Sequence, residues 1–335
     1  LLDRGSRSTI AATVRALRDE IDLALAIGLK EVFLFMPVSP QHLQHKFGLT
    51  LEQARRRIEE AIDHAIARGL RVHFVAEDTV RADPVEVAAV FDRASELGAT
   101  TAIVCDTVGV MRPEKMTEYV ATLTRHMKSK IALGVHCHND YGLGTANTLA
   151  AVGAGCSMVT GTVNGLGERA GNAPLEEVIC ALEGLYDRKL GIDKSVLTRL
   201  CETVAAASGV FLTPTKPIVG LNVFRHESGV HVDGMLKDPS TYESIDPASL
   251  GRTHEFLLGK HSGRGLVETL LAREGIKAAP EVVLRILERV KFAKSSRDKS
   301  PFPEMAERLR QFWSNHLSFG EDQFWEIARE ELAKG

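Results

Sequence analysis

Short apolar runs rich in β-branched residues alternate with longer segments of helical periodicity along the first half of the chain. The runs span residues 12–17, 31–36, 71–75, 101–105, 131–138 and 157–163. Between them lie segments such as LEQARRRIEEAIDHAIAR at 51–68, in which apolar residues recur at helical spacing. Strands that alternate with helices in this way predict βαβ units and a parallel sheet.

Polar residues stand where five of the six predicted strands end. They are residues 37–39, Glu77 and Asp78, Asp106 and Thr107, His136 and His138, and Asn164. In a (β/α)8 barrel this edge of the sheet carries the catalytic groups. A doubly wound open sheet is the alternative, but we favour the barrel because so many strands end in polar residues. About six strands are recognisable, so the sequence predicts an α/β fold: a (β/α)8 TIM barrel lacking its first two βα units.

The pattern changes near residue 190. We predict a partial TIM-barrel catalytic domain at 1–190 and a mostly helical C-terminal module at 191–335. Within that module, a linker or subdomain region at about 210–260 begins with Pro and Gly residues and continues as an irregular, His-rich stretch.

Composition narrows the range of partners. The chain has 335 residues and a net charge of −3, which gives no indication of nucleic acid or a membrane surface as partner. No run approaches the roughly 18 apolar residues of a membrane span. The five cysteines contain no CxxC pair, so we expect a reduced, cytoplasmic chain.

The stretch GVHCHNDYGLG at 134–144 holds the first candidate chemistry. In a strand, His136 and His138 point to the same face, so two imidazole nitrogens can reach one divalent ion. The alternative is a pair of hydrogen-bonded core histidines. We favour the metal site because the pair lies at a strand end and is followed directly by Asn and Asp.

Other strand ends carry further candidates. The loop NGLGERAGNAP at 164–174 has glycines that allow close backbone approach, with Asn172 able to offer an amide oxygen. Glu77 and Asp78 form a carboxylate pair that suits acid/base work, or equally a charge pair at a helix N-terminus. In the second module, the histidines of HESGVHVDG lie in a loop, where histidines are more often surface residues.

Five motifs in order carry a family resemblance: CDTVG, GVHCHNDYGLGTANTLAAVGAG, GTVNGLGERAGNAPLEEV, HESGVHVDG and LGKHSGR. Together the motifs resemble the acetyl-CoA-dependent condensing branch of the DRE-TIM metallolyases. The resemblance implies a (β/α)8 barrel with a divalent metal (Mg²⁺, Mn²⁺ or Zn²⁺) in its mouth. It also implies a homodimer in which a helical C-terminal region reaches the partner's active site. The implied reaction is a Claisen condensation of acetyl-CoA with a 2-oxo acid.

The resemblance also assigns roles to individual residues. It implies His136, His138 and Asn172 at the metal; Glu77, His231 and Tyr242 as catalytic groups; and Thr107, His42 and His73 as substrate contacts. Of these, Thr107 would contact the oxo-acid carboxylate, and His42 matches a family stretch within SPQHLQHKFG.

The sequence departs from the family at its start. The family motif resembling DTTLRDGEQ, which supplies an Asp metal ligand and a catalytic Arg, does not occur here. We therefore expect an N-terminally truncated copy that does not close into a barrel alone, because two sheet edges stay open.

The substrate stays open among several synthases. Homocitrate synthase is the preferred interpretation, although His73 stands where homocitrate synthases of lysine synthesis have an Arg. The alternatives are 2-isopropylmalate or citramalate synthase, a specialised relative of the phosphinomethylmalate or Re-citrate type, an inactive fragment, or a lyase. The last is disfavoured because no cysteine occurs between Cys156 and Cys180, where the lyases carry one in the glycine-rich loop.

Overall fold

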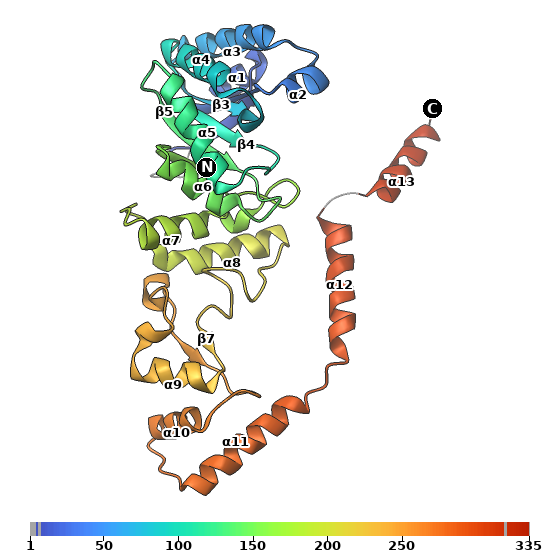
Figure 1. Ribbon diagram of the computed structural model, residues 1–335. Coiled ribbons are helices and arrows are strands. Elements are labelled where there is room, and N and C mark those ends of the chain that lie inside the picture. Colours follow the sequence, from blue (N-terminus) through green and yellow to red (C-terminus); the bar gives the residue numbers. More distant parts are fainter. Residues whose placement is uncertain (1–4, 6–7, 318–319, 335) are drawn as a thin grey trace. The chain divides into compact units, whose positions relative to one another are not determined.

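The computed structural model describes residues 5, 8–317 and 320–334. Packing divides the chain into two compact units, Leu1–Arg188 and Lys189–Gly335, each of which is described by itself (Figure 1).

The first unit is built on a six-stranded parallel sheet in the order β1-β2-β3-β4-β5-β6. Its strands are β1 (Ala11–Arg15), β2 (Glu31–Pro37), β3 (Arg71–Glu77), β4 (Thr101–Asp106), β5 (Ala132–Cys137) and β6 (Met158–Thr160). Each strand pairs with the next one in sequence, as consecutive βα units of a barrel do. The predicted parallel sheet is confirmed, with β1 and β6 as its outer strands among the described residues.

Helices connect these strands and cover one face of the sheet (Figure 1). They are α1 (Arg18–Ala26), α2 (Pro40–His42), α3 (Leu51–Ile66), α4 (Pro84–Glu96), α5 (Pro113–His126), α6 (Gly144–Gly153) and α7 (Leu175–Leu185). Local sequence sets their limits. Thr50 and Gln53 form a capping box at the start of α3. Gly69, at φ 81°, ends that helix in the left-handed conformation that glycine adopts at little cost.

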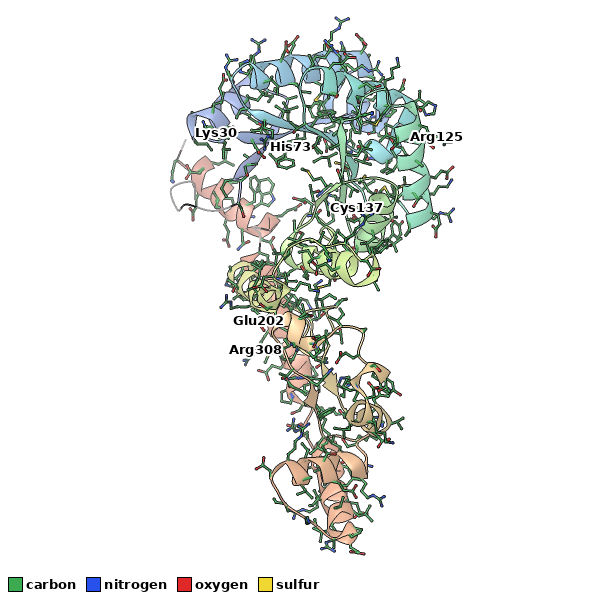
Figure 2. All side chains as sticks on the ribbon, turned by 90° about the vertical axis from the view of Figure 1, so that its left-hand side faces the viewer. Lys30, His73, Arg125, Cys137, Glu202 and Arg308 are labelled. Atoms are coloured by element: carbon green, nitrogen blue, oxygen red, sulfur yellow. The ribbon has the colours of Figure 1, made fainter. Side chains whose placement is uncertain are left out.

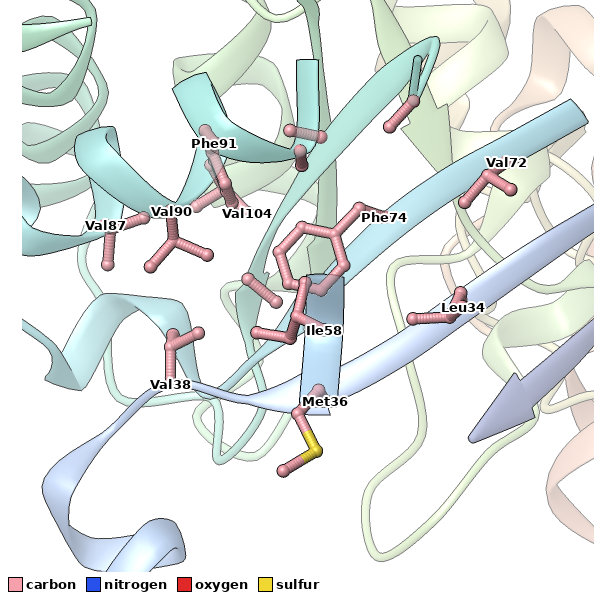
Figure 3. Packing of buried hydrophobic residues seen from close by; sticks show 14 of the residues in the cluster. Leu34, Met36, Val38, Ile58, Val72, Phe74, Val87, Val90, Phe91 and Val104 are labelled. Atoms are coloured by element: carbon pink, nitrogen blue, oxygen red, sulfur yellow. The ribbon is translucent and has the colours of Figure 1, made fainter. Parts of the chain in front are cut away.

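The core lies between the sheet and these helices. Along β2, Val32, Leu34 and Met36 are buried on the helix side. The alternate residues Glu31, Phe33 and Phe35 are only half-buried on the other face. Phe74 of β3 is fully buried and meets Phe91 of α4 edge to face, with ring centroids 6.1 Å apart (Figure 3). The opposite face of the strands therefore corresponds to the interior of a barrel and is available for polar groups.

The last strand is shorter than the sequence predicts, because the run at 157–163 forms a strand only over Met158–Thr160. A side chain at Gly161 would stand 2.8 Å from the Ala173 carbonyl oxygen, so another part of the backbone lies against the chain here. The chain then turns through a 3₁₀ helix, Val163–Gly165, in which Asn164 takes a φ of 63°. The run past Thr160 is thus a turn that supports the glycine-rich loop.

The second unit is mostly helical, as predicted. Its helices are α8 (Leu197–Ser208), α9 (Gly229–Lys237), α10 (Arg264–Arg273), α11 (Pro280–Ser295), α12 (Pro301–His316) and α13 (Glu321–Leu332). Two short strands, β7 (Arg225–His226) and β8 (Glu255–Phe256), pair in parallel. Across the described part of the chain, no helix combines the length and apolar character needed to cross a membrane.

The packing predicts that Phe74→Ala lowers the free energy of unfolding by about 3–5 kcal/mol, because it opens a cavity in the sheet–helix core. Leu23→Ala, at a side chain that is 61% exposed on α1, should change it by less than about 0.5 kcal/mol. Urea unfolding followed by far-UV circular dichroism checks both. Equal midpoints for the two variants would contradict the packing described here.

Candidate functional site

The register of the sheet brings four side chains into one row at the carboxyl ends of the strands. Cys105 of β4 pairs with His136 of β5, which pairs with Thr160 of β6. On β3, Ala76 pairs with Val104, so the next residue, Glu77, stands beside Cys105. Since neighbouring strands lie about 4.8 Å apart, the backbones of Glu77 and His136 stand about 10 Å apart. The row therefore places a carboxylate opposite the histidine motif.

The two histidines of the motif lie against each other, with ring centroids 5.1 Å apart and planes at 86°. His136 Nδ1 is 2.8 Å from Thr160 Oγ1, and that hydroxyl donates to the Val135 carbonyl at 3.2 Å. With the hydroxyl hydrogen directed to that carbonyl, His136 Nδ1 is the donor and Nε2 carries the lone pair. Burial, and then His138, lower the pKa of His136 to about 4. The ring is therefore neutral at pH 7 and can act as a ligand.

Asn172 lies beside His138, because the two residues form an antiparallel backbone bridge. The Asn172 amide nitrogen donates to the Leu166 carbonyl at 3.2 Å. Asn172 Oδ1 and His138 Nδ1 are both buried without a hydrogen-bond partner. Burial also lowers the pKa of His138, with Arg169 as the next cause. Unpartnered buried polar atoms are costly, and these two fit a bound cation.

The residues present therefore fit a divalent metal with two imidazoles and one amide oxygen as donors. Within residues 5, 8–317 and 320–334, no group of three or more His, Cys, Asp or Glu side chains converges as a metal cage. A mixed nitrogen and oxygen donor set suits several divalent metals. The structure brings together the predicted His136, His138 and Asn172, and their role as ligands remains a prediction.

The glycine-rich loop is fastened over this region by an ion pair that the sequence analysis missed. Arg169, at a φ of 56°, holds both carboxylate oxygens of Asp140 at 2.7 and 2.9 Å and donates to the Thr107 carbonyl at 2.8 Å. A side chain at Gly109 would stand 2.6 Å from Asp140 Oδ2. The only local signal for this contact is the Asp that follows the histidine motif.

Glu77 lies on the inner face with two basic side chains beside it. Lys46 Nζ contacts its two carboxylate oxygens at 2.8 and 3.1 Å. His42 Nδ1 is 3.5 Å from Glu77 Oε1. The structure thus brings the predicted residues His42 and Glu77 together. It also places Lys46 at the same carboxylate, which the sequence did not predict.

Asp78 plays a different part from its neighbour. It is fully buried at a φ of 60°, accepts a hydrogen bond from the Ser39 hydroxyl, and is held by the Arg81 guanidinium at 2.7–2.9 Å. Its backbone N–H donates to Thr107 Oγ1 at 2.8 Å. Of the two adjacent carboxylates, Asp78 therefore organises the loops, while the catalytic role of Glu77 stays a prediction.

His73 is not brought to this end of the sheet. It precedes Glu77 by four residues, or about 13 Å along the strand. Its Nε2 is 3.3 Å from Glu31 Oε2 and its ring stacks on Phe33 at 4.6 Å. Figure 2 shows His73 on the sheet and Arg125 on the outer helical side. A substrate contact at His73 remains a prediction, and it requires a ligand that extends deep into the inner face.

His231 and Tyr242 lie in the second unit, where their rings stack with centroids 4.2 Å apart and planes at 29°. His231 is in the first turn of α9, and Tyr242 follows a short 3₁₀ turn, Pro239–Thr241. The structure therefore brings the predicted pair together, while its catalytic role stays a prediction.

Comparison with known proteins identifies the family. A family profile described as "HMGL-like" matches residues 1–204, and one described as "Homocitrate synthase post-HMGL domain-like" matches residues 218–298. The chain belongs to the HMGL-like family. The second match places it on the condensing branch that the five motifs indicate, so the resemblance is confirmed.

Three curated relatives are named as three different synthases. The chain is 44% identical over 289 residues to a putative (R)-citramalate synthase of Archaeoglobus fulgidus, covering 86% of this chain and 59% of the relative. It is 42% identical over 287 residues to homocitrate synthase AksA of Methanopyrus kandleri, covering 86% and 72%. It is 42% identical over 282 residues to a probable 2-isopropylmalate synthase of Ignicoccus hospitalis, covering 84% and 70%. The chain thus spans well under the full length of these relatives.

Solved structures support the fold alone. The hydroxymethylglutaryl-CoA lyase of Pseudomonas aeruginosa matches with a TM-score of 0.56 at 24% identity, covering 62% of this chain and 73% of that one. The corresponding lyase of Bacillus subtilis gives 0.57 at 21% identity, covering 65% and 75%.

If the donor set holds a metal, Asn172→Ala should weaken Mn²⁺ binding to the full chain by about 10-fold or more, as loss of a supporting or direct ligand does. His136→Gln should weaken it further. His126→Gln, at a histidine that bonds its own helix on α5, is the matched control. Isothermal titration calorimetry measures all three, and unchanged affinity in the first two variants would exclude this site.

Proposed function

We propose that the protein condenses acetyl-CoA with a 2-oxo acid in a metal-dependent Claisen reaction. The observation that carries this proposal is the row at the strand ends. It sets the backbones of Glu77 and His136 about 10 Å, two strand spacings, apart on the same face of the sheet. In this proposal the acetyl thioester methyl lies near the carboxylate and the keto group lies near the metal donors. Relatives named as citramalate, homocitrate and isopropylmalate synthases support the same reaction class.

In this proposal Glu77 accepts the methyl proton of the acetyl group. The resulting enolate attacks the keto carbon of the oxo acid, and hydrolysis of the thioester by water then releases free CoA. The ion pair with Lys46 at 2.8 Å holds the Glu77 side chain in place at the strand end. His42, 3.5 Å away, can orient the same carboxylate. The Thr107 hydroxyl, placed by the backbone of Asp78, is available to the carboxylate of the oxo acid.

His136, His138 and Asn172 would hold the metal, with His136 offering the lone pair on Nε2. When bound, the metal would polarise the keto carbonyl as a Lewis acid. The loop fastened by Arg169 and Asp140 keeps Asn172 next to His138.

The 2-oxo acid has two candidate types. Homocitrate synthesis, from the dicarboxylic 2-oxoglutarate, is supported by the domain match at 218–298 and by the AksA relative. A short, uncharged side chain, as in pyruvate or 2-oxoisovalerate, is favoured by a specific contact. Glu31 already contacts both His73 and Arg71, so neither side chain is left without a partner for a distal carboxylate.

The proposal includes a homodimer in the cytoplasm, in which His231 and Tyr242 of the second unit complete a partner's site. The stacking of these two rings supports a shared role. The five cysteines, all buried as thiols, suit a reducing compartment.

Glu77→Gln should lower kcat for acetyl-CoA-dependent condensation by about 100-fold or more, because the amide cannot accept the proton. The assay follows free CoA with a thiol reagent in the presence of Mn²⁺ and each oxo acid. Glu52→Gln, at an exposed carboxylate on α3, is the control. A Glu77→Gln variant with the parent rate would remove Glu77 from the mechanism.

The same assay identifies the acceptor. CoA release with pyruvate or 2-oxoisovalerate but not 2-oxoglutarate would reject homocitrate synthesis. Release with 2-oxoglutarate alone would support it. No release with any oxo acid would refute the condensing function for this chain.

A further inference from the structure

Three polar side chains in the second unit hydrogen-bond in series. The carboxylate Oε2 of Glu243 is 2.7 Å from His254 Nε2, and His254 Nδ1 is 3.3 Å from His226 Nε2. The two rings lie 5.3 Å apart. His226 belongs to β7, and His254 directly precedes the partner strand β8. The parallel pairing of two short strands therefore sets this series of contacts.

Aromatic rings enclose the series. Phe224 meets the His254 ring edge to face at 6.0 Å, and Phe256 lies 6.1 Å from the His226 ring. The side chains of His254 and Glu243 are only 18% and 23% exposed. A hydrogen bond to a charged group is stronger where water is largely excluded, so this contact is more than a surface ion pair.

Donor and acceptor rules give the series a direction. The Glu243 carboxylate can only accept, so His254 Nε2 donates to it. When His254 is neutral, its Nδ1 is then an acceptor and His226 Nε2 donates to it. His226 then keeps its lone pair on Nδ1. In that state one carboxylate sets the tautomer of two successive rings.

The series is joined to the stacked pair of His231 and Tyr242 at two points. Tyr242 immediately precedes Glu243, so the residue that stacks on His231 is bonded to the residue that anchors the series. At the other end, His226 leads through residues 227–228 into α9, whose first turn carries His231. The Tyr242 ring also packs over Gly234 of α9, where a side chain would stand 3.0 Å from it.

We propose that Glu243, His254 and His226 form a hydrogen-bonded relay that fixes the tautomer of His226 and positions the His231–Tyr242 pair. The three are positioning residues, because they act through that pair. The proposal rests on the proposed function for the catalytic role of the pair, while the relay itself is a property of the second unit.

Nitrogen NMR of the full chain labelled with ¹⁵N-histidine tests the relay directly. At a pH high enough to leave His254 neutral, the parent protein should show His254 and His226 protonated at Nε2 and not at Nδ1. Glu243→Leu, which removes the acceptor, should change the ring nitrogen shifts of both histidines and the ring shifts of His231. Glu243→Gln keeps an accepting oxygen and should restore the parent tautomers.

Glu255→Leu is the matched control, because it breaks the neighbouring Arg225–Glu255 ion pair without touching either ring nitrogen. Should Glu243→Leu fail to fold, His254→Phe preserves the ring contacts and removes both nitrogens, and it should release the His226 tautomer. The relay is overturned if Glu243→Leu alters His254 alone, or if Glu255→Leu alters His226 equally.

Activity provides the second readout. Glu243→Leu should lower kcat by about 10-fold, less than the roughly 100-fold loss of a group that itself transfers a proton. KM for the oxo acid should stay unchanged, and Glu243→Gln should recover most of the loss. If the parent chain releases no CoA, the proposed function fails, while the NMR result still decides the relay. A fall in kcat with unchanged His226 nitrogens would overturn the relay.

Discussion

The candidate site depends on the pairing register of β3 through β6. In a parallel sheet with helices on one face, alternate side chains face opposite sides, so a shift of one residue exchanges the two sets. The observed register turns Glu77 and His136 to the inner face and Ala76 and Cys137 to the helices. A slip in any one strand would bury a reactive group in the apolar core, where an unpaired charge is costly. The apolar packing of the helix layer therefore maintains the geometry of the site.

Polar groups near the site fall into two classes, those with protein partners and those without. Asp78 is buried and fully engaged by Ser39 and Arg81, and a buried charge of this kind is tolerated only when it is paired. His138 and Asn172 instead keep buried polar atoms without protein partners. Leaving such atoms without a hydrogen-bond partner reduces the free energy of unfolding, and a bound cation would recover part of that loss. The paired groups hold the loops in place, and the unpaired groups mark where a ligand fits.

Much of the first unit could be predicted from sequence because its signals are local. Strands buried on the helix side have apolar runs, and Gly69 marks the end of a helix through its positive φ. His136 and His138 followed from the two-residue period of a strand. The pairs Lys46–Glu77 and Asp140–Arg169 could not be predicted, since their members are 31 and 29 residues apart in the chain. Their contacts depend on loop conformations, such as the positive φ of Arg169, for which no local pattern exists.

In each unit, one histidine needs a lone pair on one ring nitrogen, and the contact at its other nitrogen sets the tautomer. A carboxylate beside His136 would favour the imidazolium, whereas the Thr160 hydroxyl accepts its Nδ1 proton without adding charge. Burial then keeps the ring neutral and leaves Nε2 free to bind. His226 likewise contacts a second ring, and the Glu243 carboxylate lies one ring further away. Burial, followed by His254 and His231, lowers the pKa of His226. In both units the contact at one ring nitrogen directs the ring and preserves a lone pair on the other nitrogen, which ligation and proton acceptance both require.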